Sequence, residues 1–504
     1  MAVDNLIVLF QAPRVNPTTQ KAHSVPIFNP LDRYGRVFFF SWFGFMTAFL
    51  SWFAFPPLLT ITIKNDLHMT AADVANSNIV ALLATLVVRM VSGPLCDRFG
   101  PRYVFAGILL SGAIPTALAG LVKDANGLIA LRFFVGILGA TFVPCQVWTT
   151  GFFDKNVVGT ANALSAGWGN VGGGVAYFVM PAVFNSLVRA RGLSDHVAWR
   201  VAYIVPFILI TAVAIAMLLL CDDTPTGKWS ERHLVIQGQS VTPPAASSVD
   251  RVVQVSGRDD SLFKGQPPKK EVDATVELAG SEPDVDIVVA TSEMVVTPTL
   301  REALSVIFSL QSLAVAAPYA CSFGAELVID SNLGSYYYRN FPYLGQTGSS
   351  SWAAMFGLLN VFFRPAGGLL GDCIYTHTGS VWGKKTWMTF LGVVAGAFEM
   401  AIGLSDPHRQ STMFGLMVGL AFFMEAANGA VFAVVPHVHP FANGIVSGLV
   451  GASGNLGGIV FAVIFRYNGT AYAKSLWIMG VVSMGANVAV AFIKPIPKGQ
   501  VGGR

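Results

Sequence analysis

The sequence predicts an all-α polytopic membrane protein whose twelve transmembrane helices form two pseudo-symmetric bundles of six. Of the 504 residues, 53% are hydrophobic and only 12% are charged, and the mean hydropathy is +0.58. Soluble globular proteins carry about twice that share of charged residues. Apolar runs of about twenty residues recur along the chain, and each is long enough to cross a hydrocarbon layer of roughly 30 Å.

Twelve apolar runs mark the expected spans. They cover approximately residues 38–62, 74–96, 101–122, 128–150, 158–186, 197–221, 308–329, 351–373, 384–404, 411–435, 443–465 and 474–494. A segment rich in Pro, Ser, Asp and Lys separates the sixth run from the seventh. It lacks apolar periodicity, as expected of a polar and partly disordered linker.

This linker divides the chain into two membrane domains. The expected plan is an N-terminal segment (1–37), a six-helix bundle (38–221), the polar linker (222–305), a second six-helix bundle (306–496) and a short tail (497–504). Basic residues are more frequent in the N-terminal segment, the linker, the tail and the loops on the same side. Because cytoplasmic loops carry an excess of Lys and Arg, we expect both termini in the cytoplasm. The plasma membrane is the location we expect for the protein.

Short elements of the first half recur in the second half. The clearest repeat is an arginine followed by a glycine four residues later and an aspartate eight residues later: Arg89, Gly93 and Asp97, then Arg364, Gly368 and Asp372. Each element lies six spans after its first copy and so crosses the membrane in the same direction. Parallel repeats of this kind are typical of transporters that bind their substrate between two halves near the midplane.

The repeated arginines are the strongest candidates for a binding site. An arginine inside a membrane span is costly unless it faces a cavity or a partner, and it is therefore a functional candidate. On their own helices, Arg89 and Arg364 have no carboxylate within two turns except Asp97 and Asp372, which belong at the helix ends. The alternatives are pairing with a buried carboxylate elsewhere and snorkelling to the interface. We favour an anion site, because a guanidinium is planar and can hold an oxyanion with two hydrogen bonds.

Two further pairs of residues repeat between the halves. Asn170 and Asn455 lie in glycine-rich runs of spans five and eleven, where small residues let helices approach closely. Each buried amide needs partners, either an anion or a neighbouring helix. Phe142 and Phe432 occupy matching positions in spans four and ten. They are either plain packing residues or two rings that face each other across the cavity and clamp a flat ion.

Polar groups in the second half are candidates for a role in energy coupling. The hydroxyl of Tyr319, midway along span seven, requires a partner. Uptake of a monovalent anion into a negative-inside cell is opposed by roughly 2.3 kcal/mol per 100 mV, so an importer needs a cation that moves with the anion. Glu326, Glu399 and Glu425 lie within spans, and we select Glu425 as the candidate proton carrier. A purely structural, neutral or hydrogen-bonded glutamate is the alternative for each.

The segment after span two carries a loop motif. The pattern G-x-x-x-D-R-x-G-x-R comprises Gly93, Asp97, Arg98, Gly100 and Arg102. It resembles the loop signature of the major facilitator superfamily. The second copy keeps only Gly368 and Asp372. The motif implies a conformational role, in which its charges tie two helices together on the cytoplasmic side in one state.

The motifs together resemble those of the nitrate/nitrite porter family within that superfamily. The runs AGWGNVGGG and GASGNLGG are similar to the family's nitrate signatures, and YGRVFFFSWFGFM and VPHVHPFANGIVSG look like fungal members. The resemblance implies proton-coupled nitrate uptake by alternating access, with nitrite as a second substrate and no obligate accessory subunit. It also implies a binding site formed by the two arginines with Phe49, Phe142, Asn170, Tyr319, Phe323, Phe432 and Asn455.

Two alternatives retain the same fold. The long linker would suit a nitrate-sensing transceptor, and a different small monovalent anion would suit the same arginines. An enzyme is not expected, because no nucleophile with a base and no set of metal ligands is present. We therefore expect no cofactor and no metal site. Nucleic acid is not an expected partner either, because the basic residues lie between the spans and not along one stripe.

Overall fold

The computed structural model describes residues 9–17, 19–59, 62–229 and 299–497. Within these residues, twelve helical segments are long and apolar enough to cross a membrane, as predicted. The first six are α2 (Arg33–Trp52) with α3 (Pro56–Leu59), α5 (Ala71–Phe99), α6 (Pro101–Ala117) with η1 (Leu118–Leu121), α7 (Ala125–Gly136) with η2 (Ile137–Thr141) and α8 (Phe142–Phe152), α9 (Val158–Arg191), and α10 (Asp195–Ala202) with α11 (Ile204–Leu220).

The second six follow after residue 299. They are α15 (Leu310–Asn340), α16 (Gly345–Leu358) with α17 (Asn360–Thr378), α18 (Val381–Ser405), α19 (Gln410–Val438), η5 (Pro440–Ala442) with α20 (Asn443–Asn468), and α21 (Tyr472–Val490). Shorter helices are α4 (Thr62–Asp66), α14 (Leu300–Ile307) and η4 (Pro342–Leu344). Most of the expected linker, residues 230–298, lies outside the described residues, as do residues 498–504 of the expected tail.

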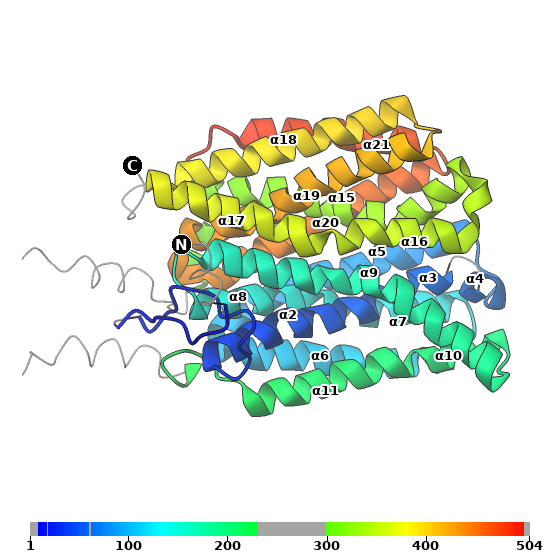
Figure 1. Cartoon of the computed structure of the whole chain (residues 1–504), viewed down its shortest axis with the longest axis horizontal. Coiled ribbons are helices and arrows are strands. Elements are labelled where there is room, and N and C mark those ends of the chain that lie inside the picture. Colours follow the sequence, from blue (N-terminus) through cyan, green and yellow to red (C-terminus); the bar gives the residue numbers. More distant parts are fainter. Residues whose placement is uncertain (1–8, 18, 60–61, 230–298, 498–504) are drawn as a thin grey trace, which may run out of the picture.

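The helices lie roughly parallel in two adjacent groups (Figure 1). Helices α2 to α11 fill the lower half of the view and α15 to α21 the upper half, and both chain ends lie at the left. We call that end of the molecule the termini side and the opposite end the distal side. The all-α, two-bundle membrane fold predicted from the sequence is confirmed.

The expected span boundaries differ from the observed ones by five residues or fewer, with one exception. Span seven was expected to end at residue 329, but α15 continues to Asn340. The apolar run stops at Asp330, where polar residues begin. The helix nevertheless continues, because Tyr336 and Tyr337 are each only 2% exposed and pack into the distal core of the second bundle. Asp330 is thus inside the helix and not in a loop.

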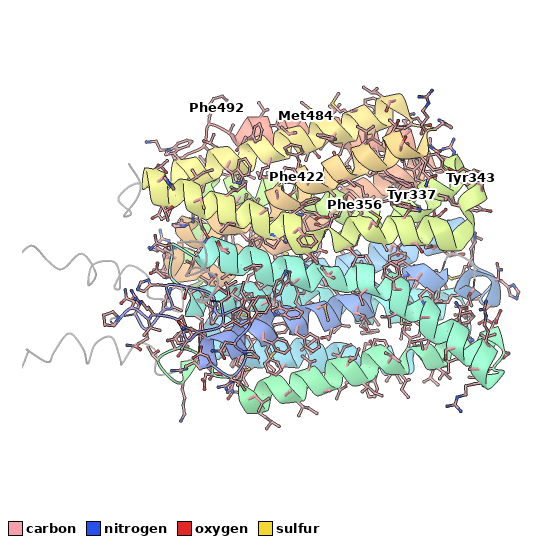
Figure 2. The ribbon with its side chains drawn as sticks, in the orientation of Figure 1. Tyr337, Tyr343, Phe356, Phe422, Met484 and Phe492 are labelled. Atoms are coloured by element: carbon pink, nitrogen blue, oxygen red, sulfur yellow. The ribbon has the colours of Figure 1, made fainter. Side chains whose placement is uncertain are left out.

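The outer surface of the bundles is apolar, and the interior holds charges. Leu121, Leu219 and Phe492 are 71%, 77% and 87% exposed. Aromatic side chains also lie near both ends of the bundle, such as Tyr343 on the distal side and Phe492 towards the termini side (Figure 2). This arrangement is the inverse of a soluble protein and suits a lipid surround with aromatic residues at its two interfaces.

Small residues bring the two bundles into contact at matching positions. Near the termini side of α5, a Cβ added to Gly93 would collide with the carbonyl of Gly444 in α20. A Cβ on Gly368 in α17 would similarly collide with the carbonyl of Gly159 in α9. The close approach of backbones accounts for these glycines, as expected for membrane helices. The α5–α20 and α9–α17 contacts form the interface between the bundles.

Candidate functional site

The two repeated arginines converge on one place between the bundles. Arg89 extends from α5 and Arg364 from α17, and both side chains are completely buried. The Arg89 guanidinium carbon lies 4.9 Å from the ring centroid of Phe142 and 5.1 Å from that of Phe323. The corresponding distances for Arg364 are both 5.6 Å. Each cation therefore lies over the same two rings, whose quadrupoles stabilise it.

Arg89 is held by backbone carbonyl groups. Its Nε donates to the Gly139 carbonyl at 2.8 Å, and one terminal nitrogen donates to the Gly451 carbonyl, also at 2.8 Å. Gly139 lies in η2, where the change from α-helical to 3₁₀ geometry frees a carbonyl for a side chain. Gly451 belongs to α20 of the other bundle, so Arg89 bridges the two halves. Among the described residues, its second terminal nitrogen has no hydrogen-bond partner.

Arg364 has a different set of neighbours. One terminal nitrogen donates to the Tyr319 hydroxyl at 3.0 Å. The other lies 3.7 Å from a carboxylate oxygen of Glu326, both side chains being at most 3% exposed. The sequence left contact with a carboxylate on another helix open, and α15 supplies such a group to Arg364. The contact is too long for a hydrogen bond.

Both arginines keep hydrogen-bonding capacity. Within the described residues, Nη2 of Arg89 and both Nε and Nη1 of Arg364 are buried without a hydrogen bond. A buried charged donor without a partner is costly. Donors from two cations that face the same pair of rings can be satisfied together by one small anion. The site is thus equipped to bind an oxyanion.

The aromatic rings pack more tightly than the sequence suggested. Tyr319 and Phe323 stack at 5.0 Å, and Phe142 lies nearly parallel to both. Phe142 and Phe432 meet edge to face, with centroids 4.8 Å apart and planes at 89°. Of the two alternatives left open by the sequence, this direct contact fits packing residues and not a clamp across a cavity. Edge-to-face contact is favoured because the positive edge of one ring meets the negative face of the other.

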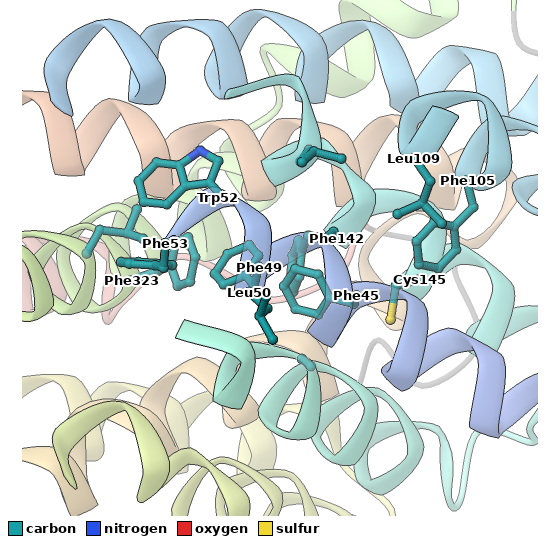
Figure 3. Packing of buried hydrophobic residues seen from close by; sticks show 14 of the residues in the cluster. Phe45, Phe49, Leu50, Trp52, Phe53, Phe105, Leu109, Phe142, Cys145 and Phe323 are labelled. Atoms are coloured by element: carbon teal, nitrogen blue, oxygen red, sulfur yellow. The ribbon is translucent and has the colours of Figure 1, made fainter. Parts of the chain in front are cut away.

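Phe49 joins the aromatic rings of the site through its neighbours in the first bundle. It packs against Phe45 and Phe53 of the first bundle, at 4.5 Å and 5.6 Å between centroids. Phe45 in turn contacts Phe142 at 5.4 Å. Figure 3 shows Phe45, Phe49, Phe142 and Phe323 in the same aromatic layer. Phe49 therefore belongs to the wall behind the site.

The two repeated asparagines have unequal roles. Asn170 in α9 donates across the bundle interface to Glu326 at 3.1 Å. Asn455 donates to the Gly451 carbonyl of its own helix at 3.2 Å, the same carbonyl that receives Arg89. Of the two alternatives left open by the sequence, a helix–helix hydrogen bond describes Asn170. Asn455 instead supports the carbonyl that holds Arg89.

Three polar residues of the site were not selected from the sequence. Asn360 and Asn428 donate to the Glu326 carboxylate at 2.8 Å and 2.6 Å, and Ser322 donates to the side-chain oxygen of Asn428 at 2.6 Å. A signal existed for Asn360, which precedes Arg364 by four residues and so shares its helix face. Glu425, our candidate proton carrier, is completely buried. In the described part of the chain, its carboxylate oxygens have no hydrogen-bond partner.

The repeated aspartates lie where the bundles meet on the termini side. One oxygen of Asp372 accepts hydrogen bonds from the backbone and hydroxyl of Thr160, at 2.6 Å and 2.8 Å, and the other pairs with Lys384 at 2.9 Å. Thr160 is in the first turn of α9, where backbone N–H groups attract a carboxylate. Asp97 occupies the matching position, against Gly444 at the start of α20.

The basic part of the loop motif acts within the first bundle. Arg102 at the start of α6 forms an ion pair with Asp223 and donates to the Cys221 carbonyl after α11. It thus ties the start of α6 to the segment that follows α11. Arg98 is exposed and lies over the ring of its neighbour Phe99. Gly100 has a φ of +90° and forms the tight turn between α5 and α6, which a side chain would strain.

The distal side differs from the closed termini side. A recess of about 360 Å³ opens there between α5 of the first bundle and α15 and α20 of the second. Its lining includes Asn78, Ser331, Asn332 and Arg466. The arginines below it are completely buried. The structure is therefore closed around the two arginines, and the recess described here lies between the bundles on the distal side.

Comparison with known proteins assigns the chain to a family. Residues 41–462 match the family model described as Major Facilitator Superfamily. The chain belongs to this superfamily and, within it, to the family of nitrate and nitrite porters, as the motifs predicted. It is therefore a transporter and not an enzyme.

Particular relatives cover nearly the whole chain. "Elsinochrome transporter 1" of Elsinoe fawcettii is 34% identical over 98% of this chain and 99% of its own length. "High affinity nitrate transporter 2.5" of Arabidopsis thaliana is 31% identical, over 94% of this chain and 82% of its own. "Nitrate/nitrite transporter NrtP" of Nostoc punctiforme is 26% identical, over 94% and 95% respectively. Relatives named for nitrate and one named for another cargo are thus both similar to this chain.

Proposed function

We propose that the protein is a secondary active transporter that imports nitrate, and nitrite as a second substrate, together with protons across the plasma membrane. The observation that carries the proposal is the convergence of Arg89 and Arg364 from opposite bundles, with unsatisfied donors on both. Nitrate is planar, monovalent and weakly hydrated, so it suits forked donors in an aromatic enclosure. No accessory subunit is required in this proposal.

Alternating access follows from the charge arrangement. Two like charges at one interface oppose its closure, and an anion between them removes that opposition. With the termini in the cytoplasm, the distal recess faces outward and the contacts around Asp97 and Asp372 close the inner side. Nitrate enters from the recess, binds both guanidiniums, and is released inward when the α5–α20 and α9–α17 contacts separate.

The proton requirement follows from the membrane potential. Moving one negative charge into the cell costs about 2.3 kcal/mol per 100 mV. Accumulation of nitrate therefore needs a cation that moves with it. The second bundle provides the acidic groups for this role. Glu326 and Glu425 are 2% and 0% exposed.

The test is nitrate uptake by cells that express Arg89→Lys or Arg364→Lys at normal surface levels. Lysine keeps the charge but loses the fork, so we expect each variant to lower apparent nitrate affinity by about tenfold or more. Arg200→Lys is the matched control, because Arg200 is 11% exposed and pairs with Asp66 far from the site. Unchanged affinity in both site variants would contradict the proposal.

A second cargo is raised by one relative. The 34% identical protein is named for elsinochrome, so the same fold could carry that compound here. The compact packing of Phe142, Tyr319, Phe323 and Phe432 around the arginines favours a small anion. Parallel assays of nitrate uptake and elsinochrome transport in the same cells separate the two. Elsinochrome transport without nitrate uptake would overturn the nitrate assignment.

A further inference from the structure

We propose that Glu326 is the proton-binding site that couples transport, because its carboxylate and the substrate anion compete for the guanidinium of Arg364. This inference rests on the proposed function. In the described residues, Glu326 is the acid in ion-pair contact with either central arginine, at 3.7 Å from Arg364. When Glu326 is ionised, it holds part of the positive charge that nitrate needs. When it binds a proton, that charge is released to the anion.

The surroundings of Glu326 suit its ionised form. Asn170 and Asn360 donate to one carboxylate oxygen at 3.1 Å and 2.8 Å, and Asn428 donates to the other at 2.6 Å. The side-chain oxygen of Asn428 lies within hydrogen-bond distance of the Ser322 hydroxyl, at 2.6 Å. Three amide donors and a guanidinium match an acceptor-only carboxylate.

The same surroundings can also accept a protonated glutamate. Within the described residues, the side-chain oxygens of Asn170 and Asn360 are buried and have no hydrogen-bond partner. Rotation of either amide by half a turn would present that oxygen to a Glu326 hydroxyl. The nitrogen and oxygen of an amide are nearly the same size, so the exchange requires little space. A site with switchable partners for both protonation states is what reversible proton binding requires.

The charge balance explains why proton and anion bind together. With Glu326 ionised, the two arginines and the glutamate carry a net charge of one. A proton alone raises this charge in a buried site, and nitrate alone brings a second anion beside the carboxylate. Binding both leaves the net charge of the site unchanged. The second ligand is therefore bound more tightly once the first is present, and this coupling is reciprocal.

A second acid, Asp330, lies close to Glu326 on the same helix. Asp330 lies one helical turn from Glu326 on α15 and is partly exposed, and its neighbours Val328, Ser331 and Asn332 line the recess. From α9, the Tyr177 hydroxyl donates to the Asp330 backbone carbonyl. Asp330 itself is not among the residues that line the recess, and its carboxylate lies near Gly357 of α16.

The other charged and titratable groups around Glu326 come from several helices. Arg364 faces it from α17, Glu425 from α19 and Tyr319 from its own helix. Arg89 approaches Tyr319 from α5. Glu399 in α18 instead lies beside Cys321. Glu399 is buried like Glu326 but has no ion-pair contact with either arginine among the described residues, which makes it the matched control for Glu326.

The experiment uses the full-length protein in liposomes. Glu326→Gln imitates the protonated side chain and cannot release a proton. We expect this variant to exchange labelled for unlabelled nitrate at a rate within about threefold of that of the unaltered protein. Its nitrate accumulation driven by a pH gradient should be lower by about tenfold or more. Glu399→Gln, the control, should retain both activities. Pronounced pH-driven accumulation by Glu326→Gln, or its loss in Glu425→Gln alone, would overturn the proposal.

Binding measurements separate this proposal from the assignment of nitrate. In detergent, the unaltered protein should bind nitrate about tenfold more tightly at the more acidic of two pH values. Glu326→Gln should bind with the higher affinity at both values. If the unaltered protein neither binds nor exchanges nitrate, the proposed function fails. If the unaltered protein binds and exchanges nitrate, two results would refute the role of Glu326 alone. In the first, nitrate binding by Glu326→Gln still depends on pH. In the second, Glu326→Gln is folded but does not bind nitrate.

Discussion

Arg89 and Arg364 occupy equivalent positions in the two halves, but their surroundings are not equivalent. Arg89 is held by two neutral backbone carbonyls, from Gly139 and Gly451. Arg364 is held by the Tyr319 hydroxyl and faces the carboxylate of Glu326. Arg89 in the first half therefore has a positive charge with no acidic partner among the described residues. The positive charge of Arg364 in the second half is partly balanced by Glu326. The pseudo-symmetric fold places two cations equally, and local chemistry gives them different tasks.

The largest expected difference is in stability when each arginine is removed. Arg364→Gln leaves the buried Glu326 without its cation, which should destabilise the protein by about 3–5 kcal/mol. Arg89→Gln leaves only carbonyls without their charged donor, at a cost of about 1–3 kcal/mol. Thermal unfolding of the purified proteins measures both.

A double variant sharpens this comparison. Glu326→Gln should restore most of the stability lost in Arg364→Gln, because the uncompensated charge is removed as well. The same substitution should give no such rescue in Arg89→Gln. Equal destabilisation by the two arginine variants, or equal rescue of both, would contradict the inequality of the two sites.

A smaller difference is expected between the repeated phenylalanines. Phe142 lies beneath both guanidiniums, whereas Phe432 meets Phe142 and Tyr319 edge to face. Phe142→Leu should destabilise the protein by about 2 kcal/mol through lost cation–π contacts. Phe432→Leu should cost about 1 kcal/mol, the value of an aromatic pair. A larger effect of Phe432→Leu in thermal unfolding would show that the ring beneath the cations is not the more important one.

The smallest expected effect concerns two aspartates in the distal loops, one in each half. Burial acts to raise the pKa of Asp66, but hydrogen bonds from His196, Trp199 and Arg200 outweigh it and lower the pKa. Burial also acts to raise the pKa of Asp406, but hydrogen bonds from Tyr336 and Asn340 outweigh it and lower the pKa. Each contribution to stability is therefore present above the unfolded pKa of about 3.9 and is lost as the pH falls through the lower folded value.

Salt distinguishes these two aspartates. The ion pair of Asp66 with Arg200 is screened by salt, whereas the neutral donors to Asp406 are not. The stability difference between the unaltered protein and Asp66→Asn, measured by unfolding between pH 3 and pH 6, should shrink with added salt. The corresponding difference for Asp406→Asn should change less. A uniform response to salt would remove this distinction between the halves.

The sequence predicted the fold well because its strongest signals are local. Apolar length alone defined the spans, and the one clear error, the end of α15, arose where Asp330 ends the apolar run but buried tyrosines continue the helix. The central arginines were also predicted, because a repeated charge within a span is itself a signal. Matching positions in the two halves then placed them at the interface between the bundles.

The partners within the site could not be predicted in the same way. The contact of Arg364 with Glu326 joins two helices whose rotation about their axes is not encoded by apolar periodicity alone. The carbonyl that receives Arg89 is available because η2 is a 3₁₀ segment, which the sequence did not reveal. The edge-to-face geometry of Phe142 and Phe432 likewise depends on packing from four helices. The pseudo-symmetry suggested equal partners, and the structure differs from the sequence-based account mainly on that point.

The central claim is that one anion is held jointly by Arg89 and Arg364, and a double-mutant cycle of nitrate binding tests it most directly. Nitrate affinity is measured by calorimetry for the unaltered protein, for Arg89→Lys, for Arg364→Lys and for the double variant. If one nitrate contacts both side chains, the double variant should lose less binding free energy than the sum of the losses in the two single variants. The difference, the coupling energy, should be about 1–3 kcal/mol. Strictly additive losses, or no loss in either single variant, would contradict the account.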